Sequence, residues 1–546
     1  MTAYETHEVR NQPPEFSSNL YLSDTALQSA ISQFDGSWGH DALCEYGQFA
    51  ADTMMSEAVR ANINKPKLNT HDRFGKRINQ VDFDPAYHQL MAQAIEAGLP
   101  SLPWRDTRKG SHAVRAALVY LHNQGECGTT CPTTMTFAAT PALHHQPDIA
   151  ERWVPLVTAP HYDGRNIPWY DKPGLTIGMA MTEKQGGSDV RANQSTAKPV
   201  GKPGGGQLYH LTGHKWFCSA PMSDGFLVLA QTDVGLGCFL MPRWTESGEL
   251  NRFQIQRLKD KLGNWSNASS EIEFREAEAW LIGEEGRGVN TIIEMVSMTR
   301  YDCMLGSASL MRQAIAQALH HCAHRDAFGK RLNQHELMQN VLADMVVESE
   351  AAMWQTFRLS AALDNPENES EQLLTRLATP IGKFWICKRT PQLVYESMEC
   401  LGGSGYVEES TMPRLFRESP LNSIWEGCGN IQSLDILRAL EKSPEASEVL
   451  FNDIELSRGS DKHLDNFVDQ LKSDIHARNV TQGAARSLAS RLARAIQASL
   501  MIRYASDPAA NYFLATRIVN EHGVYGAHDA PELAASIIES SLDLNA

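Results

Sequence analysis

The spacing of apolar residues divides the chain into stretches of helical and of strand-like pattern. Between residues 46 and 176 apolar side chains recur every three or four positions, as in HAVRAALVYLHNQGE at 112–126, which predicts amphipathic helices. Between 177 and 285 the apolar runs are short and β-rich, and EIEF at 271–274 alternates polar with apolar residues. The helical period returns after Gly288 and continues nearly to the end. The pattern therefore predicts helices, then a β-domain, then helices again.

This order of elements predicts a multidomain α+β protein. Residues 1–45 are polar and contain Pro13 and Pro14, which predicts an extended arm before the first helices. The segregated helices and strands exclude a doubly wound nucleotide-binding fold, because strands and helices alternate in that fold. The chain also has neither GxGxxG after a strand nor GxxxxGK[ST], so a dinucleotide would have to bind to another architecture.

Composition and length fit several packed globular domains. The chain has 546 residues, of which 42% are apolar and 21% charged, and it is longer than one hydrophobic core supports. No run approaches the roughly 18 consecutive apolar residues of a membrane span. The N-terminus also lacks a basic segment followed by an apolar run. We therefore expect a cytoplasmic protein without membrane contact.

The ten cysteines are scattered singly and form no CxxC motif, which indicates reduced thiols. The spacing of His320, Cys322 and His324 would allow two histidines to share a metal ion. These residues lie in a helical pattern, however, and no second pair of ligands follows them. We expect an ordinary helix surface there and no metal.

The run MTEKQGGSD at 181–189 follows a predicted strand and opens the β-domain. Its adjacent glycines, the second of which is Gly187, let backbone N–H groups approach an anionic or planar ligand. Thr182 and Ser188 supply hydroxyl groups for ring heteroatoms or phosphate oxygens. A polar turn with an Asp or Ser cap would have the same composition, so both interpretations stay open at this point.

A second candidate is the run TGHKWFCS at 212–219, which contains Lys215, Trp216 and Phe217. A tryptophan in a strand usually belongs to the core. The neighbouring polar residues and the glycine instead favour one face of a ligand site.

Two glycine-containing turns in the second helical region are further candidates. Arg325 stands before DAFG at 326–329, and an exposed arginine near a helix-breaking glycine suits a bidentate hold on a pyrophosphate. A surface arginine without a role is the commoner explanation for such a residue. The second turn, LGGSGY at 401–406, interrupts two helical patterns.

The run NSIWEGCGNIQ at 422–432 places an acid, Glu426, between Trp425 and Gly427 in a tight loop that opens a helix. Apolar neighbours would raise the pKa of such a carboxylate and make it a competent base. The alternative is a glutamate that caps the helix that follows.

Taken together and in this order, these motifs closely resemble the acyl-CoA dehydrogenase superfamily over residues 85–440. Within the superfamily, the chain most resembles the AidB-type branch, whose members are flavoproteins of the bacterial adaptive response to DNA alkylation. The segments that carry this resemblance are CPTTMTFAATP, MTEKQGGSDV, KLGNWSNAS and NSIWEGCGNIQ. The resemblance implies FAD between a middle β-domain and a four-helix bundle, and a homotetramer. It also implies these boundaries: an arm (1–45), a helical N-terminal domain (46–176), an antiparallel β-domain (177–285), the bundle (286–443) and a helical extension (444–546).

The resemblance also assigns roles to individual residues. It implies that Glu426 removes the α-proton of an acyl thioester while the flavin accepts the β-hydride. The second base position of the family, the residue before an arginine, is Thr299 here, and a threonine cannot act as this base. The implied FAD contacts are Met181, Thr182, Gly187, Ser188, Lys215, Trp216, Phe217, Arg325, Phe328, Gly402, Gly403, Ser423, Ile424, Trp425, Gly427 and Cys428.

Several positions depart from the family pattern. Trp425 replaces a smaller tyrosine and would narrow the substrate pocket, whereas Cys218 and Cys428 replace threonines. These departures predict weak, residual acyl-CoA dehydrogenase activity. A working dehydrogenase on a branched or unusual acyl-CoA, and a binding protein in which FAD is purely structural, remain alternatives.

The C-terminal extension holds the candidate DNA contacts. The net charge of −16 disfavours nucleic-acid binding by the surface as a whole, but it does not exclude a local basic patch. Residues 475–506 contain five arginines and no acid, and leucine or isoleucine recurs every fourth residue from Leu488, which predicts an amphipathic helix on the bundle. The resemblance supports binding of double-stranded DNA through Arg486, Arg491 and Arg494; a solvated charged face is the alternative.

Overall fold

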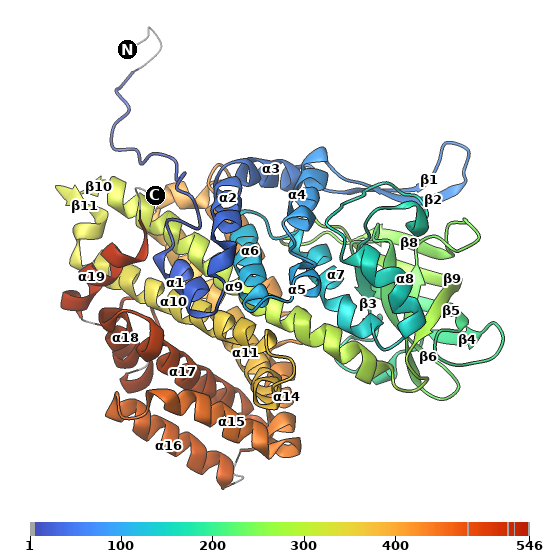
Figure 1. Ribbon diagram of the computed structural model, residues 1–546. Helices are drawn as coiled ribbons and strands as arrows, with labels where there is room; N and C mark the ends of the chain where they lie inside the picture. The colour runs from blue at the N-terminus through green and yellow to red at the C-terminus, as the bar shows by residue number, and fades with distance from the viewer. Residues whose placement is uncertain (1–5, 478–479, 521–522, 529, 544–546) are drawn as a thin grey trace. The chain divides into compact units, whose positions relative to one another are not determined.

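The computed structural model describes residues 6–477, 480–520, 523–528 and 530–543 (Figure 1). The chain forms two compact units: unit one is Met1–Ala51 together with Cys303–Ala546, and unit two is Asp52–Asp302. Among the described residues, no helix is long and apolar enough to cross a membrane.

Unit two begins with helices and a two-stranded hairpin. The hairpin, β1 (Lys67–His71) and β2 (Arg77–Asp82), was not predicted. Every residue of α6 is buried, so this helix forms the centre of the helical part. The helices are α3 (Thr53–Ile63), α4 (Pro85–Glu96), α5 (Leu102–Arg105), α6 (Ser111–Gly125), α7 (Thr130–Leu143) and α8 (Pro147–Val157), followed by the short turn η2 (Trp169–Asp171).

The rest of unit two is a seven-stranded sheet in the order β3-β6-β4-β5-β9-β7, with β8 paired to β9. Because β6 also pairs with β7, the strands β6-β4-β5-β9-β7 close on themselves. Most pairings are antiparallel, as expected, but β3 and β4 both run parallel to β6. The strands are β3 (Ile177–Ala180), β4 (Thr196–Pro199), β5 (Leu208–Ser219), β6 (Gly225–Gln231), β7 (Leu236–Pro242), β8 (Phe253–Leu258) and β9 (Ser269–Ile282).

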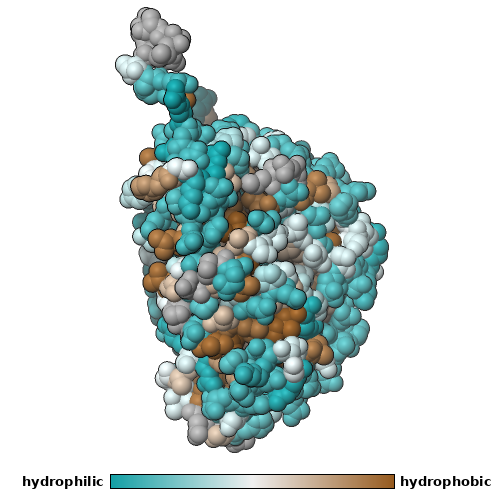
Figure 2. All heavy atoms as spheres, turned by 90° about the vertical axis from the view of Figure 1, so that its left-hand side faces the viewer, coloured by the Kyte–Doolittle hydropathy of each residue, from teal (hydrophilic) through white to brown (hydrophobic). Residues whose placement is uncertain are grey.

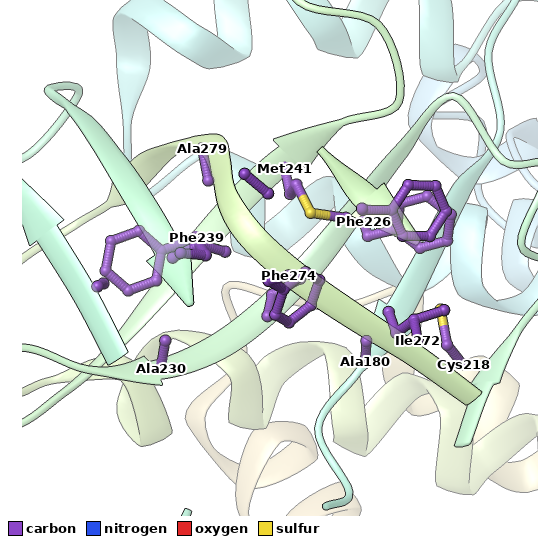
Figure 3. Close-up of a cluster of buried hydrophobic side chains, with 14 of the residues drawn as sticks. Ala180, Cys218, Phe226, Ala230, Phe239, Met241, Ile272, Phe274 and Ala279 are labelled. Atoms are coloured by element: carbon purple, nitrogen blue, oxygen red, sulfur yellow. The ribbon is translucent and has the colours of Figure 1, made fainter. Parts of the chain in front are cut away.

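The core of the β-domain fills the space that these strands enclose (Figure 3). Phe226, Phe239 and Phe274 are fully or almost fully buried there, and smaller side chains such as Ala230 and Ala279 pack beside them. Burial of large aromatic side chains provides most of the driving force for such a core. The core therefore gives the segments that leave β3 and β5 a rigid base.

Unit one contains the bundle. The long helix α9 (Gly288–His324) begins in unit two and continues into unit one, where α10 (Glu336–Leu363) packs on α11 (Glu369–Cys400). The predicted N-terminal arm is extended only in its first part, because residues 25–51 are largely helical. The remaining elements are α1 (Thr25–Gln33), η1 (Ser37–Gly39), α2 (His40–Ala51), β10 (Asp326–Ala327), β11 (Lys330–Arg331), η4 (Leu332–Gln334), α12 (Gly403–Tyr406), α13 (Met412–Glu418), η5 (Leu421–Ser423) and α14 (Gly429–Lys442).

The C-terminal extension packs on the bundle through α17 (Ala485–Tyr504), which contacts α10 and α11 (Figure 1). Leu488, Leu492, Ile496 and Leu500 are buried in this contact, which confirms the predicted amphipathic helix. The other elements are α15 (Pro444–Ile454), η6 (Glu455–Ser457), α16 (Lys462–His476), η7 (Gln482–Ala484), α18 (Asp507–Phe513), η8 (Leu514–Val519) and α19 (Pro531–Ser541).

Candidate functional site

The predicted site residues fall into two groups, one in each unit. The group in unit two begins at the turn after β3, where the backbone N–H of Trp216 donates to the carbonyl of Thr182 over 2.8 Å. A Cβ atom at Gly187 would lie 2.3 Å from Oγ1 of Thr182, so the turn closes this tightly only with glycine. Met181 and Thr182 are half-buried, and Ser188 is exposed. The turn therefore presents hydroxyl groups and backbone at the surface of the β-domain.

Trp216 and Phe217 lie beside this turn at the end of β5 and form an accessible aromatic surface. Phe217 is 50% exposed. The ammonium of Lys259 lies 3.3 Å from the centroid of the Trp216 ring, and that of Lys184 lies 5.7 Å away. An aromatic surface with cations around it suits a planar ligand that carries negative charge.

Lys215 does not belong to this surface, which corrects the expectation for that residue. Its side chain points into the domain and forms a fully buried ion pair with Glu183, with 2.9 Å between Nζ and Oε1. Nζ also donates to the carbonyl of Leu229 over 2.7 Å. The reason is the two-residue period of a strand, which turns Lys215 away from the side on which Trp216 lies. Lys215 therefore holds the turn from inside the β-domain through Glu183.

The electrostatics of this pair stabilise its charged form. Burial by itself would raise the pKa of Glu183, but N–H groups of Gln194 and Gln185 and the ammonium of Lys215 lower it to about 2. Burial lowers the pKa of Lys215, and its hydrogen bond to Glu183 opposes that effect. The carboxylate is therefore ionised at neutral pH and provides a fixed acceptor beneath the turn.

The group in unit one contains the loop 422–428 between η5 and α14. Glu426 has φ 57°, a left-handed conformation that L side chains rarely adopt, and Gly427 follows with φ 91°. The indole Nε1 of Trp425 donates to Oδ1 of Asn422 over 2.9 Å. Ile424 and Cys428 are exposed, whereas Ser423, Trp425, Glu426 and Gly427 are half-buried. Strained backbone at an acidic residue is typical of functional sites.

The alternative role of Glu426 as a helix cap does not match the local geometry. The residue at the N-cap of α14 is Cys428, whose backbone is extended. Glu426 precedes the N-cap by two residues. The other family position for a base, Thr299, is buried and its Oγ1 donates to the carbonyl of Val296 over 3.0 Å.

Two side chains that the sequence reasoning missed hold this loop. Lys383 of α11 donates from Nζ to the carbonyls of Asn422, Trp425 and Gly427 at 3.0, 2.8 and 2.9 Å. Gln432 donates from Nε2 to the carbonyls of Glu426 and Gly427 at 3.1 and 2.9 Å. A charged residue inside the apolar run TPIGKFWIC was the only signal that could have identified Lys383.

The remaining candidates of unit one lie on exposed turns. Phe328 and Gly329 form the tip of the β10–β11 hairpin with φ of 51° and 85°, and Phe328 is 99% exposed. Arg325 lies just before this hairpin and donates from Nη1 to the carbonyl of Asn11. No described atom lies within 4 Å of a Cβ placed on Gly402 or Gly403, so the backbone of that turn is open to a ligand or a second chain.

The candidate DNA contacts differ in their accessibility. Arg486 is exposed and lies 3.3 Å from Oδ1 of Asn430. Arg491 is half-buried and pairs with Asp474 over 2.7 Å. Arg494 is buried and donates to the carbonyl of Arg517 over 3.1 Å, so its guanidinium is turned away from solvent.

These residues fit FAD. The unit-two group offers a glycine-lined turn with two hydroxyls and an aromatic surface, and the unit-one group offers an arginine and an open glycine backbone. No group of three or more His, Cys, Asp or Glu residues suited to a metal occurs in the part of the chain that is described. The chain combines a helical bundle, a β-domain with an aromatic surface at Trp216 and Phe217, and a loop that carries one acid, Glu426. This combination is typical of flavin-dependent dehydrogenases.

The comparisons with known proteins identify the family. Three family models match: the adaptive response protein AidB N-terminal domain (residues 11–164), the acyl-CoA dehydrogenase middle domain (178–277) and the acyl-CoA dehydrogenase C-terminal domain (286–441). The chain is 43% identical to AidB of Escherichia coli over 95% of its own length and 96% of that protein. It is 30% identical to acyl-CoA dehydrogenase family member 11 of Caenorhabditis elegans, over 85% and 80% of the two chains.

Solved structures support the same assignment. ACDH-11 of C. elegans in complex with C11-CoA superimposes with a TM-score of 0.84 at 26% identity, over 99% of this chain and 94% of that one. Butyryl-CoA dehydrogenase of Megasphaera elsdenii shares the fold, with a TM-score of 0.60 at 18% identity over 77% and 98%. The chain therefore belongs to the acyl-CoA dehydrogenase family and is AidB-like. It is an FAD-dependent oxidoreductase of the type that acts on CH–CH bonds, which confirms the predicted fold class and cofactor.

Proposed function

We propose that this chain is a flavoprotein of the adaptive response to DNA alkylation that binds double-stranded DNA, protects it and retains weak acyl-CoA dehydrogenase activity. The enzymatic part rests chiefly on one observation, the loop in which Glu426 takes a left-handed backbone between Trp425 and Gly427. Its position in the family motif is that of the base. The expected cytoplasmic location belongs to this proposal as well.

In this proposal the protein residues carry out binding and proton transfer. FAD, when bound, supplies the hydride acceptor. Met181, Thr182 and Ser188 bind it at the β-domain turn, and Trp216 provides an aromatic face. The carboxylate of Glu426 takes the α-proton of the acyl thioester. Trp425, hydrogen-bonded to Asn422, limits the space beside that carboxylate, which is the physical reason for weak activity.

The assignment to the alkylation response has two supports. The N-terminal family model carries the description of an adaptive response protein. In addition, Arg486 is an exposed cation on the C-terminal extension, where the DNA contact is proposed. The burial of Arg494 and the pairing of Arg491 with Asp474 restrict the proposed patch chiefly to Arg486.

A homotetramer is the proposed assembly. Figure 2 shows hydrophobic side chains that reach the surface in several places on one face of the molecule. Phe328, Leu337 and Tyr406 of unit one are 99%, 83% and 81% exposed and could pack against a second copy of the chain in the proposed assembly. Multi-angle light scattering of the holoprotein tests the assembly, and a monomer would contradict it.

The second candidate is a working dehydrogenase on a branched or unusual acyl-CoA. It is favoured by the high structural similarity to ACDH-11, a protein solved with C11-CoA. Because ACDH-11 binds an acyl-CoA, the proposed substrate class for this chain is an acyl-CoA in both cases.

Anaerobic reduction of the flavin by a panel of acyl-CoAs, including isovaleryl-CoA, tests the proposal. We expect slow bleaching in the wild type and a rate lower by about a hundredfold or more in Glu426→Gln, with FAD retained. Glu409→Gln, at an exposed glutamate outside the loop, is the control and should match the wild type. Fast bleaching by one thioester would favour the second candidate, and wild-type rates in Glu426→Gln would place the base elsewhere.

A further inference from the structure

The ammonium group of Lys383 is buried among backbone carbonyls. Lys383 is 1% exposed, and its hydrogen-bond partners in the described part of the chain are three carbonyl oxygens and no carboxylate. A buried charge without an ion-pair partner is costly unless all its donors are used. The three N–H donors of an ammonium meet three acceptors here, so this site is fully satisfied.

The three carbonyls belong to residues on both sides of Glu426. Trp425 precedes it and Gly427 follows it, at 2.8 and 2.9 Å from Nζ. One cation therefore fixes the peptide group before the strained residue and the peptide group after Gly427. Hydrogen bonds from a charged donor are stronger than neutral ones, and a left-handed backbone at a glutamate persists only where its surroundings determine it.

The position of Lys383 is itself fixed by the packing of α11. A Cβ atom at the preceding residue, Gly382, would lie 2.2 Å from Cε of Met304 on α9, so the two helices pack closely here and a larger residue would displace that methionine side chain. The ammonium of Lys383 therefore reaches the loop from a closely packed helix.

We propose that Lys383 is a positioning residue for Glu426, which holds the loop 422–427 so that the carboxylate is presented for proton abstraction. The proposal rests on the proposed function of Glu426 as the base. Lys383 touches neither substrate nor flavin in this proposal and acts only through the loop.

Lys383→Met removes the charge and keeps a similar volume. In the holoprotein we expect the maximal rate of flavin reduction by an acyl-CoA to fall at least about tenfold, with the half-saturating concentration changed less than about threefold. Lys383→Arg, which keeps the charge and the donors, should recover most of the lost rate. Lys388→Met is the matched control, because it removes a cation of the same helix close to Cys428 that donates to none of these three carbonyls.

Hydrogen exchange provides a readout that does not depend on chemistry. In Lys383→Met with FAD bound, the peptide that covers 421–428 should exchange faster, while peptides of the β-domain remain as in the wild type. Wild-type rates in Lys383→Met, an equal loss in Lys388→Met, or a lost rate without faster exchange of the loop would each overturn the proposal.

The two hypotheses can fail separately. If Glu426→Gln reduces its flavin at the wild-type rate, Glu426 is not the base. The positioning role of Lys383 is then wrong as well, even if the loop exchanges faster in Lys383→Met. If Glu426→Gln is inactive and Lys383→Met is fully active, the base assignment stands and only the role of Lys383 is wrong.

Discussion

Lys215 and Glu183 form an ion pair whose side chains are both 0% exposed, with 2.9 Å between Nζ and Oε1. Glu183 belongs to the turn 181–188 that we assign to FAD, and its side chain points into the β-domain, where it meets Lys215. Removing one partner from a buried pair leaves an uncompensated charge and costs about 3–5 kcal/mol.

We therefore expect Glu183→Gln to lower the stability of the protein by about that amount and to weaken retention of FAD. The double variant Glu183→Gln/Lys215→Met should recover part of the stability, because the unpaired ammonium is gone. Thermal midpoints and the ratio of flavin to protein absorbance measure both effects. A single variant as stable as the wild type would show that the pair contributes nothing.

The C-terminal extension is tied to the bundle by Arg517, which pairs with Asp344 of α10 over 2.6 Å and with Glu348 over 2.8 Å. Arg517→Met would leave two buried carboxylates with less compensation, and we expect a loss of about 3–5 kcal/mol. Limited proteolysis should then cleave the extension earlier than the bundle. Arg458→Met, at an exposed pair with Asp469, is the control and should leave stability close to that of the wild type, because water screens an exposed ion pair.

Glu350 makes stability depend on pH. Burial and the nearby carboxylate of Asp24 raise its pKa to about 7, although Trp354 and Arg312 oppose this. Because the folded pKa lies above the unfolded value, the folded state binds the proton more tightly, and stability falls as pH rises from about 4.5 to about 7. Glu350 keeps some exposure, so we expect an effect of about 1–2 kcal/mol.

Glu350→Gln should therefore have a higher thermal midpoint than the wild type at about pH 8 and lose this advantage at about pH 5. Differential scanning calorimetry across this range measures the difference. Glu367→Gln, at an exposed position, serves as the control. An advantage that is independent of pH would rule out titration of Glu350 as the cause.

The proposed DNA contact can be tested through its dependence on salt. If Arg486 and Arg491 contact phosphates, the double variant to Gln should flatten the log–log salt dependence of affinity by about 0.9 for each contact. Arg494→Gln should act on stability instead, because its guanidinium is buried. Fluorescence anisotropy measures the affinity for duplex DNA at several salt concentrations. An unchanged slope in the double variant would mean that any DNA contact comes from another surface.

Arg325 is the predicted phosphate ligand of FAD. Arg325→Ala should weaken the retention of FAD by about 10- to 150-fold, since a charged hydrogen-bonded contact contributes about 1.5–3 kcal/mol. Equilibrium dialysis measures the change, with Arg331→Ala of the same hairpin as the control. Equal retention in both variants would falsify the assignment of Arg325.

Local sequence patterns determined much of the secondary structure and the candidate catalytic residue. Short β-rich runs and turn residues located the β-domain, and the alternation of 271–274 located β9, because a strand with one buried face has a period of two. They missed β4 and β8, because TAKP and the FQIQ part of β8 are only about four residues long; the two segments form strands by pairing with β5 and β9. The motif at 422–432 identified Glu426, since an acid between tryptophan and glycine is visible in the sequence itself.

The burial of the charged side chains and their hydrogen-bond partners were determined only by the tertiary structure. The sequence placed Lys215 at a ligand face and Arg494 on a phosphate-binding face, but both side chains are buried. Lys383 looked like any lysine in a helix, although it holds the loop that carries Glu426. The physical reason is that the role of a long charged side chain depends on acceptors contributed by segments far away in the sequence. Hydrophobic period and turn chemistry are local and can be read directly, whereas the environment of a charge exists only after the chain has folded.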